Sequence, residues 1–125
     1  MAHDNAYELY QRGCALAASG SHMAAATVLE RACEVEPEKT SIRSALGLAL
    51  FRSRRFSEAA DAFTAVIEAN PADHHAHYGL GLARSRLGDL VSAGAHLKMA
   101  CVMRPDLEAY SEALAALERR LGTEG

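Results

Sequence analysis

The segment Asp73-His74-His75-Ala76-His77 is the one cluster in the sequence whose residue types could bind a metal ion or transfer protons. Histidine nitrogens are good zinc ligands, but a protein site needs at least three ligands around the ion. On a helix, His74 and His77 share one face while His75 points elsewhere, so at most two of them reach one ion. No carboxylate or cysteine stands at a spacing that completes the set. The segment predicts no metal site, and we expect a solvated helix start with His75 facing a groove.

Three cysteines, Cys14, Cys33 and Cys101, are the other candidates for metal or redox chemistry. Their odd number and wide separation argue against a disulfide framework and favour a reducing cytosol. No CxxC or CxxH spacing is present, so the cysteines predict no zinc site. We expect them to be small apolar fillers, with Cys14 more accessible than the other two.

Sequence motifs of enzymes are missing. The chain has no nucleophile elbow, phosphate-binding loop, HExxH motif or dinucleotide fingerprint. Its serine, histidine and aspartate residues show no spacing that organises them into a catalytic group. The sequence therefore predicts a protein that is not an enzyme and needs no cofactor.

The composition excludes several classes of partner. A net charge of -3 and a pI near 6.0 argue against a dedicated nucleic-acid binder and against attraction to an anionic membrane. No apolar run approaches the roughly 18 residues that cross a bilayer. The first residues also lack the basic start and apolar core of a signal peptide. With 50% hydrophobic residues, many of them alanine, we expect a folded, helical, cytoplasmic protein without membrane insertion.

A period of 34 residues organises the whole chain. Four columns of like residues share it: Pro37, Pro71 and Pro105; Gly13, Gly47 and Gly81; Ala25, Ala59 and Ala93; Leu29, Phe63 and Leu97. Such a repeat is typical of stacked helix hairpins. We expect the first helix of each unit over 5–18, 39–52 and 73–86, and the second over 21–34, 55–68 and 89–102.

Local signals support these boundaries. Proline ends the second helix of each unit because it lacks the amide donor and clashes with the preceding turn. Ser21 and Asp89 stand where an N-cap is needed, and Ser57 is expected to serve in place of Arg55. The glycine column would cost about 1 kcal/mol per helix relative to alanine. We therefore expect each glycine to allow close approach of the second helix, whose alanine column would face it.

The pattern Leu46-Gly47-x2-Leu50-x8-Ala59-x3-Phe63-x7-Pro71 resembles the tetratricopeptide repeat. The resemblance covers about residues 5 to 105, with departures at Arg12, at Arg84 and in the column of Leu9, Arg43 and His77. It implies an all-α superhelix, one domain over 1–125 with units at about 6–39, 40–73 and 74–107.

The last part of the chain predicts a helix over 106–121 that caps the array. Its apolar side is formed by Leu107, Tyr110, Leu114, Leu117 and Leu121, spaced at three and four residues. An array with an exposed apolar end needs such a cap.

In tetratricopeptide proteins the hollow beside the first helices is the usual ligand groove. In this chain the first helices carry an apolar and aromatic stripe that is distinct from the stripe expected to pack in the core. Leu9, Gly13 and Leu16 form the packing stripe of the first helix. The predicted groove residues are Tyr7, Tyr10, Cys14, Ser44, Leu48, Phe51, Arg52, His75, Tyr78, Leu82 and Arg86. Tyrosine offers rigid apolar area with a polar tip, which suits protein contacts. Packing of these rings against a neighbouring helix or a second copy is the alternative.

Two further features refine the expected ligand. Members of the family that hold the C-terminal carboxylate of heat-shock chaperones use a clamp of Lys, Asn, Asn, Lys and Arg. The matching positions here hold Tyr10, Cys14, Ala45, His75 and Gly79, so that clamp is not expected. Arginines gather near the ends of two first helices, where they could meet an acidic partner or be solvated and favour the helix dipole.

The sequence thus predicts a protein-interaction module that binds a peptide or protein segment in its groove, as a scaffold, adaptor or small chaperone-like protein. Its apolar groove is similar in architecture to that of small secretion chaperones. The alternative is a self-associating structural subunit, a homo-oligomer without a separate peptide ligand.

Overall fold

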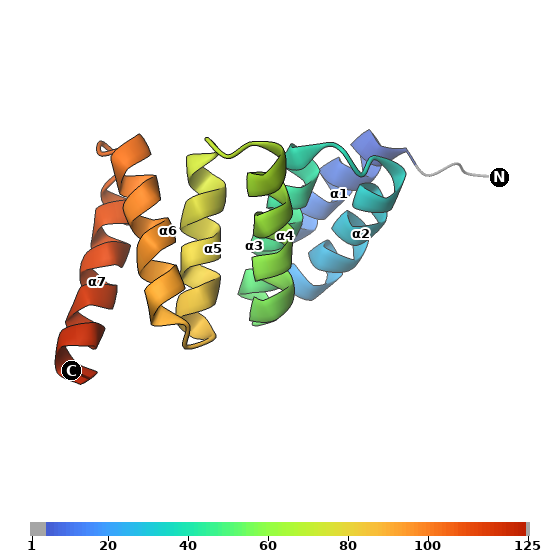
Figure 1. Cartoon of the computed structure of the whole chain (residues 1–125). Helices are drawn as coiled ribbons and strands as arrows, with labels where there is room; N and C mark the ends of the chain where they lie inside the picture. The colour runs from blue at the N-terminus through green and yellow to red at the C-terminus, as the bar shows by residue number, and fades with distance from the viewer. Residues whose placement is uncertain (1–4, 125) are drawn as a thin grey trace.

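The computed structural model describes residues 5–124, which form seven α-helices joined by short turns (Figure 1). Three helix hairpins follow one another: unit 1 has α1 (Ala6–Ala18) and α2 (His22–Val35), unit 2 has α3 (Thr40–Arg52) and α4 (Phe56–Ala69), and unit 3 has α5 (His74–Arg86) and α6 (Leu90–Met103). A final helix, α7 (Glu108–Glu124), packs on unit 3. The predicted all-α array of three hairpins and a capping helix is confirmed.

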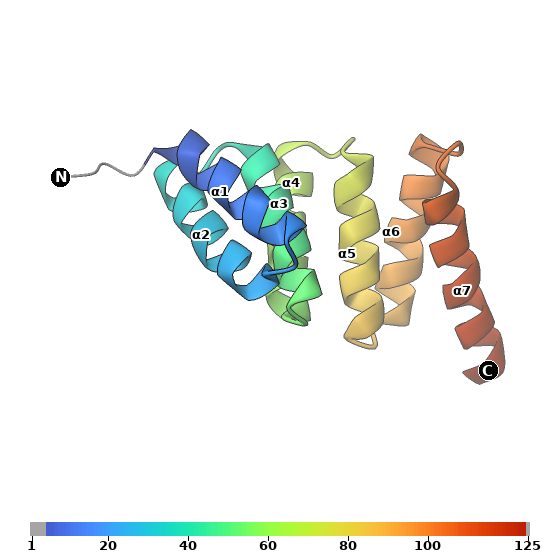
Figure 2. The same cartoon turned by 180° about the vertical axis from the view of Figure 1, so that it is seen from behind.

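The helices form two layers. Viewed from one side, α2, α4 and α6 lie in front, and the opposite view brings α1, α3 and α5 forward (Figures 1 and 2). Each first helix contacts the first helix of the next unit, as well as its own hairpin partner. We call the face formed by α1, α3 and α5 the groove face, and the contact between neighbouring units a joint.

Side-chain caps start three of the seven described helices, with two corrections to the predicted caps. The side chains of Asn5, Asp73 and Asp89 accept hydrogen bonds from amides in the first turns of α1, α5 and α6. Ser21 occupies the same repeat position as Asp89, but its side chain makes no capping bond. Ser57 lies inside α4 and is not the cap, and Arg55 at the cap position pairs with Glu58 instead.

The turn inside each hairpin requires a left-handed residue. Gly20 and Gly88 have φ of 89° and 87°, conformations that glycine adopts without strain. Arg54 takes the same place in unit 2 with a φ of 65°, and no other described non-glycine residue has a positive φ.

Large apolar side chains fill each hairpin against a glycine. A Cβ atom added at Gly13, Gly47 or Gly81 would lie 2.6 to 2.8 Å from Leu29, Phe63 or Leu97, respectively. Close approach is therefore the role of the glycine column, as predicted. The nearest atoms belong to the large apolar column, and at Gly81 the backbone oxygen of Ala93 also lies 3.2 Å from the added Cβ atom.

Phe63 also joins unit 2 to unit 3. A Cβ atom added at Gly79 would lie 2.5 Å from the tip of the Phe63 ring, so one buried ring contacts a glycine in α3 and another in α5. The residues 34 positions away from Gly79 are Ala45 and Ala113. Ala45 lines a pocket together with Leu29, and Ala113 packs against the cluster that contains Leu97. The second joint therefore pairs a larger side chain with a smaller partner.

The capping helix covers the end of the core. Tyr110 and Leu117 of α7 are buried, Leu107 and Leu114 are partly buried, and Leu121 is 41% exposed, beyond the end of the covered surface. None of the described helices is both long and apolar enough to cross a membrane.

Candidate functional site

The predicted groove residues all lie on α1, α3 and α5, but the structure divides them among three regions. Tyr7, Leu48, Arg52, His75 and Arg86 are exposed, and the remaining predicted residues are partly buried. One region lies at the first joint, one at the second joint and one against the capping helix.

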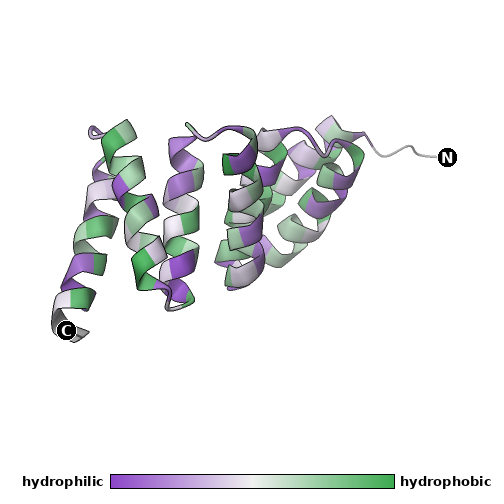
Figure 3. Ribbon diagram, in the orientation of Figure 1, coloured by the Kyte–Doolittle hydropathy of each residue, from purple (hydrophilic) through white to green (hydrophobic). Residues whose placement is uncertain are grey.

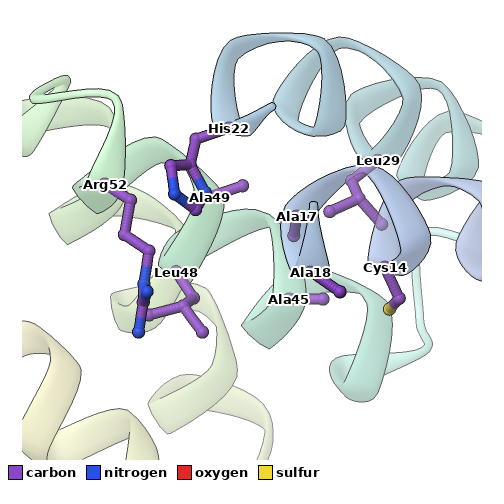
Figure 4. Close-up of a pocket in the computed structure, with 9 residues that line it drawn as sticks. All are labelled: Cys14, Ala17, Ala18, His22, Leu29, Ala45, Leu48, Ala49 and Arg52. Carbon is purple, nitrogen blue, oxygen red and sulfur yellow. The ribbon is translucent and has the colours of Figure 1, made fainter. Parts of the chain in front are cut away.

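The first joint contains a pocket of about 330 Å³ (Figure 4). Its lining comes from three helices: Cys14, Ala17 and Ala18 of α1, His22 and Leu29 of α2, and Ala45, Leu48, Ala49 and Arg52 of α3. Cys14, Leu48 and Arg52 are predicted groove residues, whereas the contribution of α2 was missed. The pocket exists because its lining side chains are mostly small.

Two polar side chains interrupt the apolar lining of this pocket. The Nδ1 atom of His22 is buried and has no hydrogen-bond partner among the described residues. A buried polar atom without a partner costs about 1–3 kcal/mol, which a bound group with a suitable donor or acceptor would offset. Arg52 lies at the rim, on the same side as the His22 ring (Figure 4). The pocket thus suits an apolar side chain accompanied by a polar group.

A second hollow of about 390 Å³ lies at the start of α1 and is lined by both predicted tyrosines of that helix. Tyr7 and Tyr10 line it together with Glu36, Lys39 and Ser41. The negative charge of a Cys14 thiolate, burial and a hydrogen bond to Cys14 raise the pKa of Tyr10.

The cysteines are free thiols with unequal exposure. Cys33 is buried, and burial raises the pKa of its thiol, which fits the predicted filler role. Cys14 and Cys101 are both partly exposed. Cys14 is therefore more accessible than Cys33, but it is not alone in being accessible.

The second joint carries aromatic rings and arginines where the first joint has its pocket. Phe51 and Phe56 pack edge to face with ring centres 5.2 Å apart. The guanidinium group of Arg86 lies 5.5 Å from the Phe51 ring centre and 5.3 Å from that of Phe56. Arg54 lies 5.5 Å from the Phe56 ring centre. Stacking on these rings holds both arginines in place.

The third region belongs partly to the core, because the capping helix packs on it. The ring centres of Tyr78 and Tyr110 lie 4.6 Å apart, and the Tyr110 hydroxyl is 2.7 Å from Nδ1 of His74. Tyr78 therefore packs against a neighbouring helix. This is the alternative that the sequence left open for the predicted groove residues. The predicted solvated helix start is wrong for His74, because Tyr110 reaches it from α7.

His77 is also not solvated; its side chain is 5% exposed. Its Nε2 atom is 2.9 Å from the carbonyl oxygen of Pro71 and its Nδ1 atom is 3.0 Å from Nδ1 of His96. Nε2 therefore donates to Pro71, and His96 donates to His77. In unit 2, Arg43 occupies the same repeat position and donates to the carbonyl of Pro37. The sequence did contain a signal for this burial, because His77 stands at the same repeat position as the buried Leu9.

Within the described part of the chain, no three His, Cys, Asp or Glu side chains are grouped so that they could hold a metal ion. His74 and His77, which share a helix face, hydrogen-bond to different helices, and His75 is exposed with its ring 6.1 Å from that of Phe63.

Comparison with known proteins gives matches over nearly the whole chain. A family model of the tetratricopeptide repeat matches residues 10–63 and 44–122. The chain is similar to the first TPR domain of Spaghetti (RPAP3) bound to the HSP90 peptide SRMEEVD, with 19% identity, a TM-score of 0.89, and coverage of 94% of this chain and 93% of that one. No curated protein sequence matches.

Two other solved structures are more similar in sequence. A fragment of MamA from Desulfovibrio magneticus RS-1 is 28% identical, with a TM-score of 0.90 and coverage of 94% of this chain and 67% of that chain. YrrB, described as a TPR protein with an unusual peptide-binding site, is 26% identical, with a TM-score of 0.84 and coverage of 89% of this chain and 57% of that chain.

Proposed function

Because this chain belongs to the tetratricopeptide repeat family, we propose that it is a protein-interaction module that binds a segment of another protein across its groove face. The observation that carries the proposal is the apolar pocket at the first joint, opening beside the exposed Leu48 and Arg52. Interface energy concentrates in a few anchors that fill such pockets. Two similar structures are described with a bound peptide or a peptide-binding site, which fits this use of the fold.

A bound segment would place an apolar side chain between α1, α2 and α3. Cys14, Ala17, Ala45 and Leu48 would contact it, and the buried core residues Leu29 and Ala49 fix part of the surrounding wall. A preformed wall lowers the entropic cost of binding. This role covers a scaffold, an adaptor or a small chaperone-like protein.

The chain itself indicates how to close the pocket. The residues of unit 2 that match Ala17 and His22 are Phe51 and Phe56, which pack on each other. The Ala17→Phe/His22→Phe variant should rebuild that ring pair at the first joint and fill the pocket. Leu48→Glu is a second test, because Leu48 is 38% exposed and can change without loss of core packing.

The experiment is selection of a random peptide library displayed on phage, followed by affinity measurement on the enriched peptides. We expect peptides to be enriched on the wild type and to bind both variants at least tenfold more weakly, about 1.4 kcal/mol. Glu30→Ala and Glu68→Ala on the outer layer are the controls and should bind normally. Circular dichroism checks folding. Absence of enrichment, or undiminished binding by both pocket variants, would contradict the proposal.

Self-association is the second candidate function, and α6 supplies the observation that favours it. Val91, Met99 and Val102 on its outer side are 84%, 46% and 78% exposed. The corresponding positions of α4 hold Ser57, Ala65 and Glu68. A homo-oligomer would cover this apolar side. Sedimentation of the wild type and of Val91→Ser/Val102→Glu tests it: a concentration-dependent oligomer lost in the variant supports association, and a wild-type monomer rejects it.

A further inference from the structure

Arginine recurs at the repeat period along one end of the groove face. Arg52, Arg86 and Arg120 are each separated by 34 residues and lie at or near the ends of α3, α5 and α7. Arg120 donates a hydrogen bond to Ser85 of α5 at 3.2 Å, which ties the last member of the row to the helix before it. Both ends of α5 are hydrophilic around an apolar middle (Figure 3).

Arg52, Arg54 and Arg86 differ from several other arginines in how they are partnered. Arg55, Arg84 and Arg104 form ion pairs with Glu58, Asp89 and Asp106. Arg52, Arg54 and Arg86 have no carboxylate within ion-pair distance in the described part of the chain.

The shortage of carboxylates is local. Helices α3 and α5 contain no aspartate or glutamate and α1 contains one, Glu8, whereas the outer helices α2 and α4 contain five and α6 contains none. The whole chain has a net charge of -3. Carboxylates are therefore absent from α3 and α5, the two helices that carry Arg52 and Arg86.

The arginines are also held in position before any ligand binds. Arg86 stacks over Phe51 and Phe56, and Arg54 over Phe56. An arginine that is already ordered loses less side-chain entropy when it binds, and its planar fork matches a carboxylate with two parallel hydrogen bonds. Gathering these cations around one ring pair is unfavourable unless an anion joins them.

The arginine row meets the apolar pocket at the end of α3. Arg52 lines the pocket, and the preceding Phe51 carries the stacked Arg86. The unpartnered Nδ1 of His22 lies in the wall of the same pocket. The apolar pocket and the arginines therefore lie next to each other, with the pocket toward α1 and the arginines toward α5.

We propose that the segment bound on the groove face is acidic, with an aliphatic side chain in the first-joint pocket and carboxylates at Arg52 and at the Arg54–Arg86 pair. This proposal rests on the proposed function and adds the chemistry of the partner. The site differs from the chaperone carboxylate clamp, whose matching positions Tyr10, Cys14, Ala45, His75 and Gly79 carry no cationic amine or guanidinium. An apolar anchor beside the charges favours a peptide over a nucleic acid.

Phage selection with the random library tests the chemistry separately from the function. Enriched peptides should carry Asp or Glu close to Leu, Ile, Val or Met, and their affinity should fall as salt increases. Selection on Arg86→Glu should lose the acidic preference, and peptides from the wild-type selection should bind this variant about tenfold more weakly. Lys98→Glu on the outer layer makes the same charge change and should leave binding unaltered.

The outcomes are distinct. Enriched peptides without acidic residues, or equal losses for Arg86→Glu and Lys98→Glu, would overturn this inference and leave the proposed function standing. No enrichment at all would remove both. A labelled single-stranded oligothymidine that displaces the selected peptides and binds as tightly would assign the arginines to nucleic acid and also overturn the proposal.

Discussion

The first and second joints are built at the same positions of the repeat, but with side chains of different size. At the first joint these positions hold Cys14, Ala17, His22 and Leu29, and at the second they hold Leu48, Phe51, Phe56 and Phe63. The first set lines a pocket of about 330 Å³, whereas the second includes the Phe51–Phe56 pair and the buried Phe63 ring. Smaller residues at the same repeat positions therefore leave space for a ligand.

The residue that faces each joint from the next helix varies in size in the opposite direction. Ala45 faces the first joint, and Gly79 faces the second, where the tip of Phe63 occupies the space of a Cβ atom. Size is thus matched across each joint, and the first still contains a pocket. The packed second joint therefore contributes mainly to stability, whereas the first joint contains the pocket proposed to bind a ligand.

The largest effect is expected from overpacking the second joint. Gly79→Leu places a branched side chain against the buried Phe63 ring, which Gly47 confines on its other side. We expect a loss of about 3 kcal/mol in the free energy of unfolding, measured by urea denaturation. Gly47→Leu should cost a similar amount. Gly94→Ala is the control, because its Cβ would make an ordinary contact at 3.6 Å with Leu117 and helix propensity would improve.

A double-mutant cycle at the same joint sharpens the comparison. Gly79→Ala and Phe63→Leu together give the second joint the residues of the first, Ala45 and Leu29. We expect the double variant to be more stable than the sum of the two single changes predicts. The coupling free energy should be about 0.5–3 kcal/mol, as is usual for residues in contact. Additive effects would mean that the two residues are not matched in size.

An intermediate effect is expected from the buried histidine pair of unit 3. His77→Leu introduces the residue of unit 1 at that position but leaves His96 Nδ1 and the Pro71 carbonyl without their partner. We expect a loss of about 2 kcal/mol in the free energy of unfolding. His77→Leu/His96→Val copies Leu9 and Val28 of unit 1 and should recover much of it, because both partners become apolar. A double variant less stable than the single one contradicts this assignment.

The same pair predicts a pH dependence. Burial lowers the pKa of His96 from its ordinary 6.5, and the charges of His77 and Arg84 lower it further. As the pH falls through about 6.5, the unfolded chain binds a proton that the folded chain does not, so stability decreases toward acid. Urea midpoints above and below that pH should show the decrease in the wild type and less of it in the double variant. His75→Gln should retain the wild-type slope.

The helices and the array were predictable because both depend on local properties that repeat at a fixed period. Proline columns mark the ends of second helices, and glycine columns mark the close contacts. The pocket was not predicted because it depends on the difference between columns, such as Ala17 against Phe51, and not on their common pattern. Contacts such as His77–His96 and His74–Tyr110 join different helices at positions without a repeated residue type, so periodicity gives no signal for them.

The smallest effect is expected at the third joint, where α7 takes the place of a further unit. Tyr110 contributes both a ring that packs on Tyr78 and a hydroxyl that bonds to His74. Tyr110→Phe removes the hydroxyl and keeps the ring, so the free energy of unfolding should fall by about 1 kcal/mol. Tyr7→Phe is the matched control, because its hydroxyl bonds to Gln11 on an exposed surface and should contribute little.

The comparison between these two variants decides what holds the capping helix. If Tyr110→Phe loses no more stability than Tyr7→Phe, the ring alone closes the third joint and the hydroxyl is dispensable. If it loses as much as Gly79→Leu, the His74 bond is the main attachment of α7, and removing it detaches the helix. The expected loss of about 1 kcal/mol for Tyr110→Phe lies between these two outcomes and follows from the geometry. The 2.7 Å bond lies beside the Tyr110 ring, and Tyr110 is 5% exposed. Loss of the hydroxyl leaves a partly buried His74 nitrogen unpaired, while Tyr78 still packs on the ring.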